Sequence, residues 1–119
     1  MAWVVVGSDV FRTWFSELSE RERKSVNRGV GLLQRLGPRL KYPYSSRVTT
    51  SRHANMRELR IQHAGRPYRV LYAFDPQRTA VLLVGGDKTG NDRWYEENVP
   101  DADRLYDMWL EDLRGRGLL

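Results

Sequence analysis

Residues 56–84 read MRELRIQHAGRPYRVLYAFDPQRTAVLLV, in which three apolar runs are separated by the turn sequences AGRP and DP. β-branched and aromatic residues favour strands, and Gly, Pro and Asp favour the turns between them. The expected strands cover residues 56–62, 68–74 and 79–84. Connections this short favour antiparallel pairing. The stretch therefore predicts a small antiparallel sheet.

The residues before this sheet predict a strand and a helical hairpin. WVVV at residues 3–6 has strand composition. Ser8 is suited to cap a first helix, because a serine hydroxyl accepts from the free N–H groups of a helix start. Ser19 and Glu22 have the spacing of a capping box for a second helix, which Gly37-Pro38 ends. Residues 39–55, rich in Ser, Thr, Arg and Pro, are expected to form a long loop.

The chain after the sheet predicts one final helix. After Gly85-Gly86 a polar loop leads to Pro100, a residue suited to the first turn of a helix. Its apolar stripe is Ala102, Leu105, Trp109 and Leu113. The expected fold class is α+β, with the N-terminal strand and helical hairpin packed on the sheet. At 119 residues we expect one domain, residues 1–119.

Alternation along the strands predicts which side chains share a face, because residues two apart point the same way. Glu58 and Arg60 therefore point together. The apolar residues Tyr68, Val70, Tyr72 and Phe74 should pack on the helices. Arg69 then lies on the opposite side. We expect a sheet with helices on one face and an open, arginine-bearing face for a ligand.

Charge is concentrated in the middle of the chain. Residues 35–78 carry ten Lys or Arg and two Asp or Glu, giving +8, whereas residues 79–119 carry five and nine, giving −4. This favours RNA, DNA or an acidic protein as partner, with a solvated basic surface as the alternative.

Several classes of site and location are excluded by composition. The absence of Cys excludes disulfides and thiolate chemistry. The longest apolar runs, residues 3–6 and 80–84, fall far short of the roughly 20 residues of a membrane span, so we expect a cytoplasmic protein without a membrane partner. No metal-ligand spacing, nucleophile elbow or P-loop occurs, so neither metal nor cofactor is expected. Asp101, Asp103 and Asp107 are expected at a helix start and on its exposed face.

Three ordered blocks carry a resemblance to a known family: SRHANMRELR at 51–60, GRPYRVLYAFDPQR at 65–78 and AVLLVGGDKTGNDRWYEENVPDADRLYD at 80–107. They resemble the phage-derived Gp49-like, HigB-type toxins of the RelE/ParE superfamily. The resemblance implies a RelE-like fold and a type II toxin–antitoxin system. It also implies a metal-independent, ribosome-dependent endoribonuclease that acts on messenger RNA. The implied partners are mRNA, the ribosome and a HigA-like helix-turn-helix antitoxin.

The resemblance places the catalytic residues at Glu58, Arg60, Arg69 and Lys88. Many HigB-type sequences have two adjacent lysines where this chain has Asp87-Lys88-Thr89. The arginines suit phosphate oxygens but are too basic to accept a proton at neutral pH. Lys88 or Glu58 must then exchange protons. The structural alternatives are an ion pair between Glu58 and the arginines, and a simple turn lysine at position 88.

Further RNA-binding candidates are Arg57, His53, Arg66, Trp94 and Tyr95. Aromatic side chains stack on single-stranded bases, although Trp94 and Tyr95 also suit a core anchor before a helix. A lone loop histidine such as His53 is more often merely exposed. Two other functions remain open: a non-catalytic inhibitor of a protein such as DNA gyrase, and an inactive RNA-binding phage accessory protein.

Overall fold

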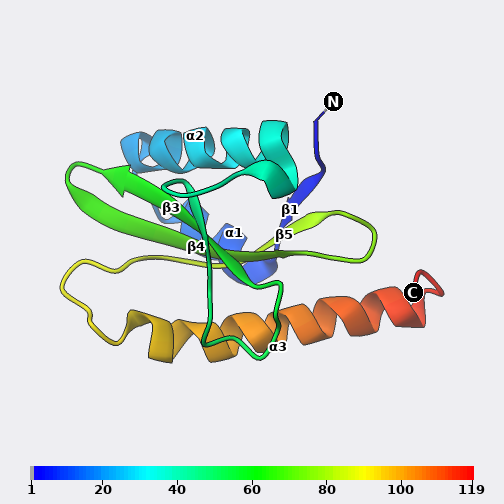
Figure 1. Cartoon of the computed structure of the whole chain (residues 1–119). Coiled ribbons are helices and arrows are strands. Elements are labelled where there is room, and N and C mark those ends of the chain that lie inside the picture. Colours follow the sequence, from blue (N-terminus) through cyan, green and yellow to red (C-terminus); the bar gives the residue numbers. More distant parts are fainter. Residues whose placement is uncertain (1) are drawn as a thin grey trace.

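A five-stranded sheet forms the middle layer of the computed structural model, which describes residues 2–119 (Figure 1). The strands are β1 (Val5–Gly7), β2 (Ser45–Arg47), β3 (Arg57–His63), β4 (Arg66–Phe74) and β5 (Ala80–Asp87). Their order is β1-β5-β4-β3-β2. β3, β4 and β5 pair antiparallel, as residues 56–84 predict. β2 adds an antiparallel strand beside β3, and β1 pairs parallel with β5.

The predicted hairpin of helices is confirmed. It consists of α1 (Asp9–Ser16) and α2 (Glu20–Leu36), followed by the short 3₁₀ turn η1 (Gly37–Arg39). The Ser8 hydroxyl accepts from the backbone N–H of Phe11 at 3.0 Å. Ser19 and Glu22 cap each other's backbone reciprocally. These caps satisfy donors that a helix start otherwise leaves without partners.

Helices cover both faces of the sheet, so the expected open face is wrong. α2 lies on one side and α3 (Trp94–Gly115) on the other (Figure 1). Leu71 and Ala73 of β4 join Val99 and Ala102 of α3 in one apolar cluster. The sequence YRVLYAF is apolar at almost every position of β4. Near-continuous apolar runs are typical of strands buried on both sides, and this explains the second helical layer.

The last helix begins at Trp94, before the predicted start, and Pro100 lies inside it. Pro100 has no N–H to donate to the helix and so removes one backbone hydrogen bond. Burial of Trp94 and Val99 against the sheet outweighs this loss. Trp94 N–H donates to the Asn91 carbonyl at the helix start.

Two further segments depart from the expectations. β2 lies within the predicted loop of residues 39–55, although its sequence SSR carries no strand signal. The loop after β2 is joined to α3, because Asp103 accepts from the Ser51 hydroxyl and from the backbone N–H of Arg52. Asp103 is therefore buried, and its expected place on an exposed helix face is wrong.

Gly85-Gly86 belongs to β5, which extends to Asp87, beyond the predicted strand end at residue 84. A Cβ at Gly85 would overlap the Trp14 ring of α1, and a Cβ at Gly86 would lie 2.6 Å from the Trp94 Nε1 of α3. The two glycines thus let an indole from each helical layer approach the sheet backbone. Gly86 is also the cross-strand partner of Arg69, so this close approach shapes the surroundings of that arginine.

Candidate functional site

Arg60 of β3 and Arg69 of β4 are direct cross-strand partners. The Arg60 N–H donates to the Tyr44 carbonyl at 2.8 Å, so its backbone turns away from β4. The pair is therefore of the non-hydrogen-bonded kind, in which opposed Cα atoms lie only about 4.5 Å apart. Like charges directly opposite each other destabilise a sheet, so this arrangement requires an anion nearby.

Glu58 supplies that anion from the same face of β3. Its carboxylate lies 3.3 Å from Arg69 Nε and 3.4 Å from Arg60 Nη1. The Tyr95 hydroxyl donates to Glu58 Oε1 at 2.6 Å, and the Ser46 hydroxyl donates to Oε2 at 2.5 Å. Both carboxylate oxygens are thus engaged. The geometry favours the ion pair over a carboxylate that is free to accept a proton.

Arg69 is buried, with 7% of its side chain exposed, so its expected exposure on an open face is wrong. Its Nη1 donates to the Tyr68 carbonyl at 2.9 Å. Its Nε has no hydrogen bond of acceptable geometry within residues 2–119. The Glu58 carboxylate, 3.3 Å away, neutralises the charge without completing a hydrogen bond to Nε. A buried donor that lacks a hydrogen bond is unfavourable, and an anionic ligand can supply the missing acceptor.

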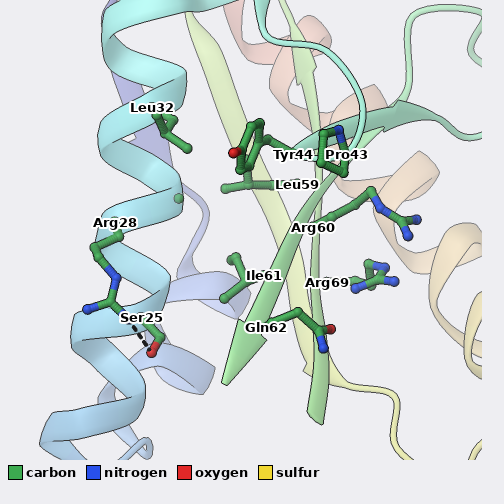
Figure 2. Close-up of a pocket in the computed structure, with 11 residues that line it drawn as sticks. Ser25, Arg28, Leu32, Pro43, Tyr44, Leu59, Arg60, Ile61, Gln62 and Arg69 are labelled. Atoms are coloured by element: carbon green, nitrogen blue, oxygen red, sulfur yellow. Dashed lines mark hydrogen bonds between the residues drawn. The ribbon is translucent and has the colours of Figure 1, made fainter. Parts of the chain in front are cut away.

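Arg60 and Arg69 border a cleft of about 450 Å³ at the free edge of β3, beyond the end of β2 (Figure 2). Figure 2 shows Leu59 and Ile61 on the side of β3 toward α2, with Arg60 and Arg69 on the other side. The remaining lining residues are Ser25, Arg28, Gly29, Leu32, Pro43, Tyr44 and Gln62. The cleft therefore joins an apolar wall to the two guanidinium groups.

Lys88 and Tyr95 extend the cluster toward α3. Lys88 is half-buried, and its ammonium nitrogen lies 5.7 Å from the centroid of the Tyr95 ring. Burial, and then the hydrogen bond to Glu58, raise the pKa of Tyr95. The phenol therefore stays protonated at neutral pH. Glu58, Arg60, Arg69, Lys88 and Tyr95 form one connected group, called the arginine cluster below.

The other RNA-binding candidates do not join the arginine cluster. Trp94 is 4% exposed and packs on Gly86, which fits the alternative of a core anchor and not base stacking. The remaining three make contacts elsewhere. Arg57 donates to the Ser45 hydroxyl, His53 contacts Asp107 and Tyr106, and Arg66 pairs with Asp87 and Glu22.

Two contributors were not predicted, Ser46 and Tyr42. Ser46 bonds Glu58 from β2, and the Arg60 guanidinium lies 5.1 Å from the centroid of the Tyr42 ring. Ser46 carries no signal in a segment without periodicity. The aromatic sequence YPY at residues 42–44 was the available signal for Tyr42.

Within residues 2–119, no group of three or more His, Asp or Glu side chains is placed to hold a metal ion. Over the same residues, none of the helices combines the length and apolar character needed to cross a membrane.

Comparison with known proteins gives consistent matches. The model of the family "Phage derived protein Gp49-like" matches residues 13–107. HigB3 of Mycobacterium tuberculosis, assigned as a toxin, is 45% identical over 105 residues, 87% of this chain and 90% of its own length. HigB2 of the same organism, also assigned as a toxin, is 38% identical over 95 residues, 78% of this chain and 47% of its own length.

Two solved structures share the fold. A mutant of the E. coli toxin RelE in the free state matches with a TM-score of 0.59 and 11% identity, over 81% of this chain and 94% of its own. The toxin–antitoxin complex RelBE2 of Mycobacterium tuberculosis matches with a TM-score of 0.55 and 21% identity, over 73% of this chain and 99% of the matched chain. The RelE-like α+β fold expected from the sequence is confirmed.

Proposed function

This chain belongs to the phage-derived Gp49-like family and is a HigB-type toxin of the RelE/ParE superfamily, and from that premise we propose that it is a metal-independent endoribonuclease. Its substrate is messenger RNA on the ribosome, so that it inhibits translation in the cytoplasm. Residues 1–119 then form one toxin domain. The observation that carries the proposal is the opposed pair Arg60 and Arg69 beside a cleft.

Cutting RNA without a metal needs a site that stabilises added negative charge. The ribose 2′-oxygen forms a bond to the neighbouring phosphorus, and the bond from phosphorus to the 5′-oxygen breaks. The phosphorane-like transition state carries more negative charge than the phosphodiester, and preorganised cations stabilise it. Arg60 and Arg69 can each offer paired N–H donors to phosphate oxygens. The Nε of buried Arg69, which is ion-paired with Glu58 but makes no hydrogen bond within residues 2–119, is such a donor.

Two protons must also move: one leaves the 2′-hydroxyl and one reaches the departing 5′-oxygen. The arginines are too basic for this task. Glu58 holds the two guanidinium groups and is hydrogen-bonded by Tyr95 and Ser46, which suits a positioning residue. We therefore assign proton exchange to Lys88, which lies against the Tyr95 ring.

The partner that restrains this activity is an antitoxin, for which we propose a HigA-like protein with a helix-turn-helix domain. The +8 segment of residues 35–78 suits an acidic strand or helix of such a partner. Co-expression with the protein encoded by the adjacent reading frame should give a co-purifying pair and restore growth. A neighbour that neither binds nor rescues would contradict this pairing.

Induction in cells, followed by mapping of mRNA 5′ ends, tests the nuclease activity. We expect codon-phased new ends with the wild type. Arg60→Ala should lower their yield by about 10²–10³-fold, the loss typical for one donor to a developing charge. Arg104→Ala is the matched control, because Arg104 is exposed on α3 and, among residues 2–119, forms a salt bridge with Asp101 alone. DNA breaks with intact transcripts would instead select a gyrase inhibitor.

The role of Lys88 is tested with purified protein on ribosomes that carry a messenger RNA. Lys88→Ala should lower cleavage, and Lys88→Arg should restore it only in part, since a fixed cation binds phosphate but exchanges a proton poorly. Equal rates for wild type and Lys88→Arg would assign the proton transfer to Glu58.

A further inference from the structure

Two tyrosines stand out because they are exposed. Tyr42 is 71% exposed and Tyr44 is 51% exposed, on either side of Pro43. The other four tyrosines of the chain are buried or half-buried: Tyr68, Tyr72, Tyr95 and Tyr106. Pro43 joins Tyr42 and Tyr44 in what is called the aromatic shelf below. Neighbouring exposed aromatic residues point to a binding surface more strongly than single ones do.

Backbone hydrogen bonds anchor the aromatic shelf. The Lys41 carbonyl accepts from the N–H groups of Tyr44 at 2.9 Å and Ser45 at 3.1 Å. The Tyr44 carbonyl accepts from the N–H of Arg60. The segment is therefore tied to β3 at the very residue that belongs to the arginine cluster. A surface ordered before binding loses less entropy when a ligand arrives.

The shelf also borders the arginine cluster through its side chains. The Arg60 guanidinium lies 5.1 Å from the Tyr42 ring centroid. Pro43 and Tyr44 line the cleft together with Arg60 and Arg69. Figure 2 shows Pro43 near Arg60 and the Tyr44 ring beside Leu59. A ligand whose phosphate meets the two arginines therefore has aromatic surface within reach.

Charge around the shelf favours an anionic ligand. Residues 35–57 carry six Lys or Arg and no Asp or Glu. Lys41 and Arg47, which flank the shelf in sequence, are exposed, and neither forms a salt bridge with any residue of the described range 2–119. Flat aromatic surface beside unpaired cations is the chemistry that binds single-stranded nucleic acid, because bases stack while phosphates meet the cations.

We propose that Tyr42 and Tyr44 stack on bases of single-stranded RNA next to the phosphate held by Arg60 and Arg69. This inference rests on the proposed function, and it names the part of the surface that holds the strand. Arg60 serves both sides of the site, since its guanidinium touches the Tyr42 ring and belongs to the arginine cluster. The stacked bases would bring their backbone toward the two guanidinium groups.

Binding is tested with a single-stranded RNA oligonucleotide that carries 2′-O-methyl groups at every ribose, which prevents attack by the 2′-oxygen. Fluorescence anisotropy measures its affinity for the full-length protein. Tyr42→Ala and Tyr44→Ala should each weaken binding by about 5- to 150-fold, because stacking on one aromatic ring contributes about 1–3 kcal/mol. Tyr42→Phe and Tyr44→Phe keep the ring and should bind as the wild type does.

Met108→Ala is the matched control, since Met108 is 59% exposed on α3, outside the shelf. Alanine variants of the shelf that bind the oligonucleotide as tightly as wild type would overturn the proposal, and so would a wild type that does not bind it. Loss of antitoxin binding with unchanged RNA affinity would also overturn it, in favour of a protein-docking surface. A wild type that binds through the shelf but leaves cellular transcripts intact would contradict the nuclease and leave the shelf standing.

Discussion

The two faces of the sheet are built from the same strands but have opposite characters. Toward α1 and α2, Leu59, Ile61 and Val70 belong to an apolar cluster, and each is at most 5% exposed. Toward α3, only part of the face is apolar, and Glu58 and Arg69 are buried beside it. The face toward α1 and α2 is part of the apolar core. The face toward α3 contains both apolar core residues and the arginine cluster.

This difference has an energetic meaning. Burial of apolar side chains is favourable by about 25 cal/mol for each Å² removed from water. Burying charges is costly, and a buried ion pair often contributes no more stability than apolar residues of the same shape. The Glu58 and Arg69 pair is therefore poorly explained by stability alone. Arg69, one member of the pair, lines the cleft, which accords with retention for ligand binding.

The largest effect on stability is expected from Glu58→Ala. Removal of the carboxylate leaves Arg69 buried without its counter-charge, which should lower the free energy of unfolding by about 3–5 kcal/mol. Glu96→Ala is the control, because Glu96 is exposed and pairs with Arg93 on the surface. Urea unfolding followed by Trp fluorescence measures both. A Glu58→Ala variant as stable as the control would show that buried Arg69 does not need the Glu58 carboxylate as its counter-charge.

The two faces should respond alike to a test of close packing. Gly85→Ala and Gly86→Ala each place a Cβ against an indole, Trp14 on one face and Trp94 on the other. Overpacking of this kind typically costs about 1–3 kcal/mol. Gly31→Ala is the matched control: it lies in α2 with open space around its Cβ, and should stabilise by about 0.5–1 kcal/mol. Thermal unfolding midpoints would reveal any asymmetry between the faces.

The core of the fold was predictable because its signals are local. The capping box at Ser19 and Glu22 and the three strands of residues 56–84 follow from short-range patterns. β2 and the start of α3 were missed for a different reason. The sequence SSR of β2 acquires strand geometry only by pairing with β3. Trp94 begins a helix because its indole packs over Gly86, a contact between distant elements.

The sequence grouped the members of the arginine cluster but predicted neither their burial nor their hydrogen-bond partners. Alternation placed Glu58 and Arg60 together, and register then set Arg69 opposite Arg60. Two neighbours of these residues come from other parts of the chain. α3 covers this face of the sheet, and the Ser46 hydroxyl of β2 bonds Glu58. Burial and hydrogen-bond saturation depend on such tertiary neighbours. The roles of individual residues therefore could not be derived from strand patterns.

A pH test examines a hydrogen bond on the face of the sheet toward α2, between Tyr68 of β4 and Glu22 of α2. The Tyr68 hydroxyl donates to Glu22 Oε2 at 2.5 Å, and this bond, with those from Ser19, lowers the pKa of Glu22 to about 2. Because the folded-state pKa is depressed, its stabilisation is complete above the unfolded value of 4.5 and is lost as pH falls toward 2. Tyr68→Phe should therefore unfold at a higher pH than wild type in an acid titration followed by circular dichroism. Coincident titrations would show that this bond does not contribute.

The smallest effect on stability is expected from substitutions in the contact between α3 and the loop after β2. Asp107 pairs with Arg52 and His53 but is 41% exposed, whereas Asp103 is buried and accepts from Ser51 and Arg52. Exposed ion pairs contribute little, since water and salt screen them. Asp107→Asn should thus leave the thermal midpoint close to wild type and only modestly speed tryptic cutting after Arg52. Asp103→Asn should speed that cutting more, because a buried acceptor for two donors is weakened. Equal digestion rates for the two variants would show that contacts other than Asp103 hold the loop after β2. The buried Asp103 carboxylate would then contribute no more to this loop than the exposed Asp107 carboxylate does.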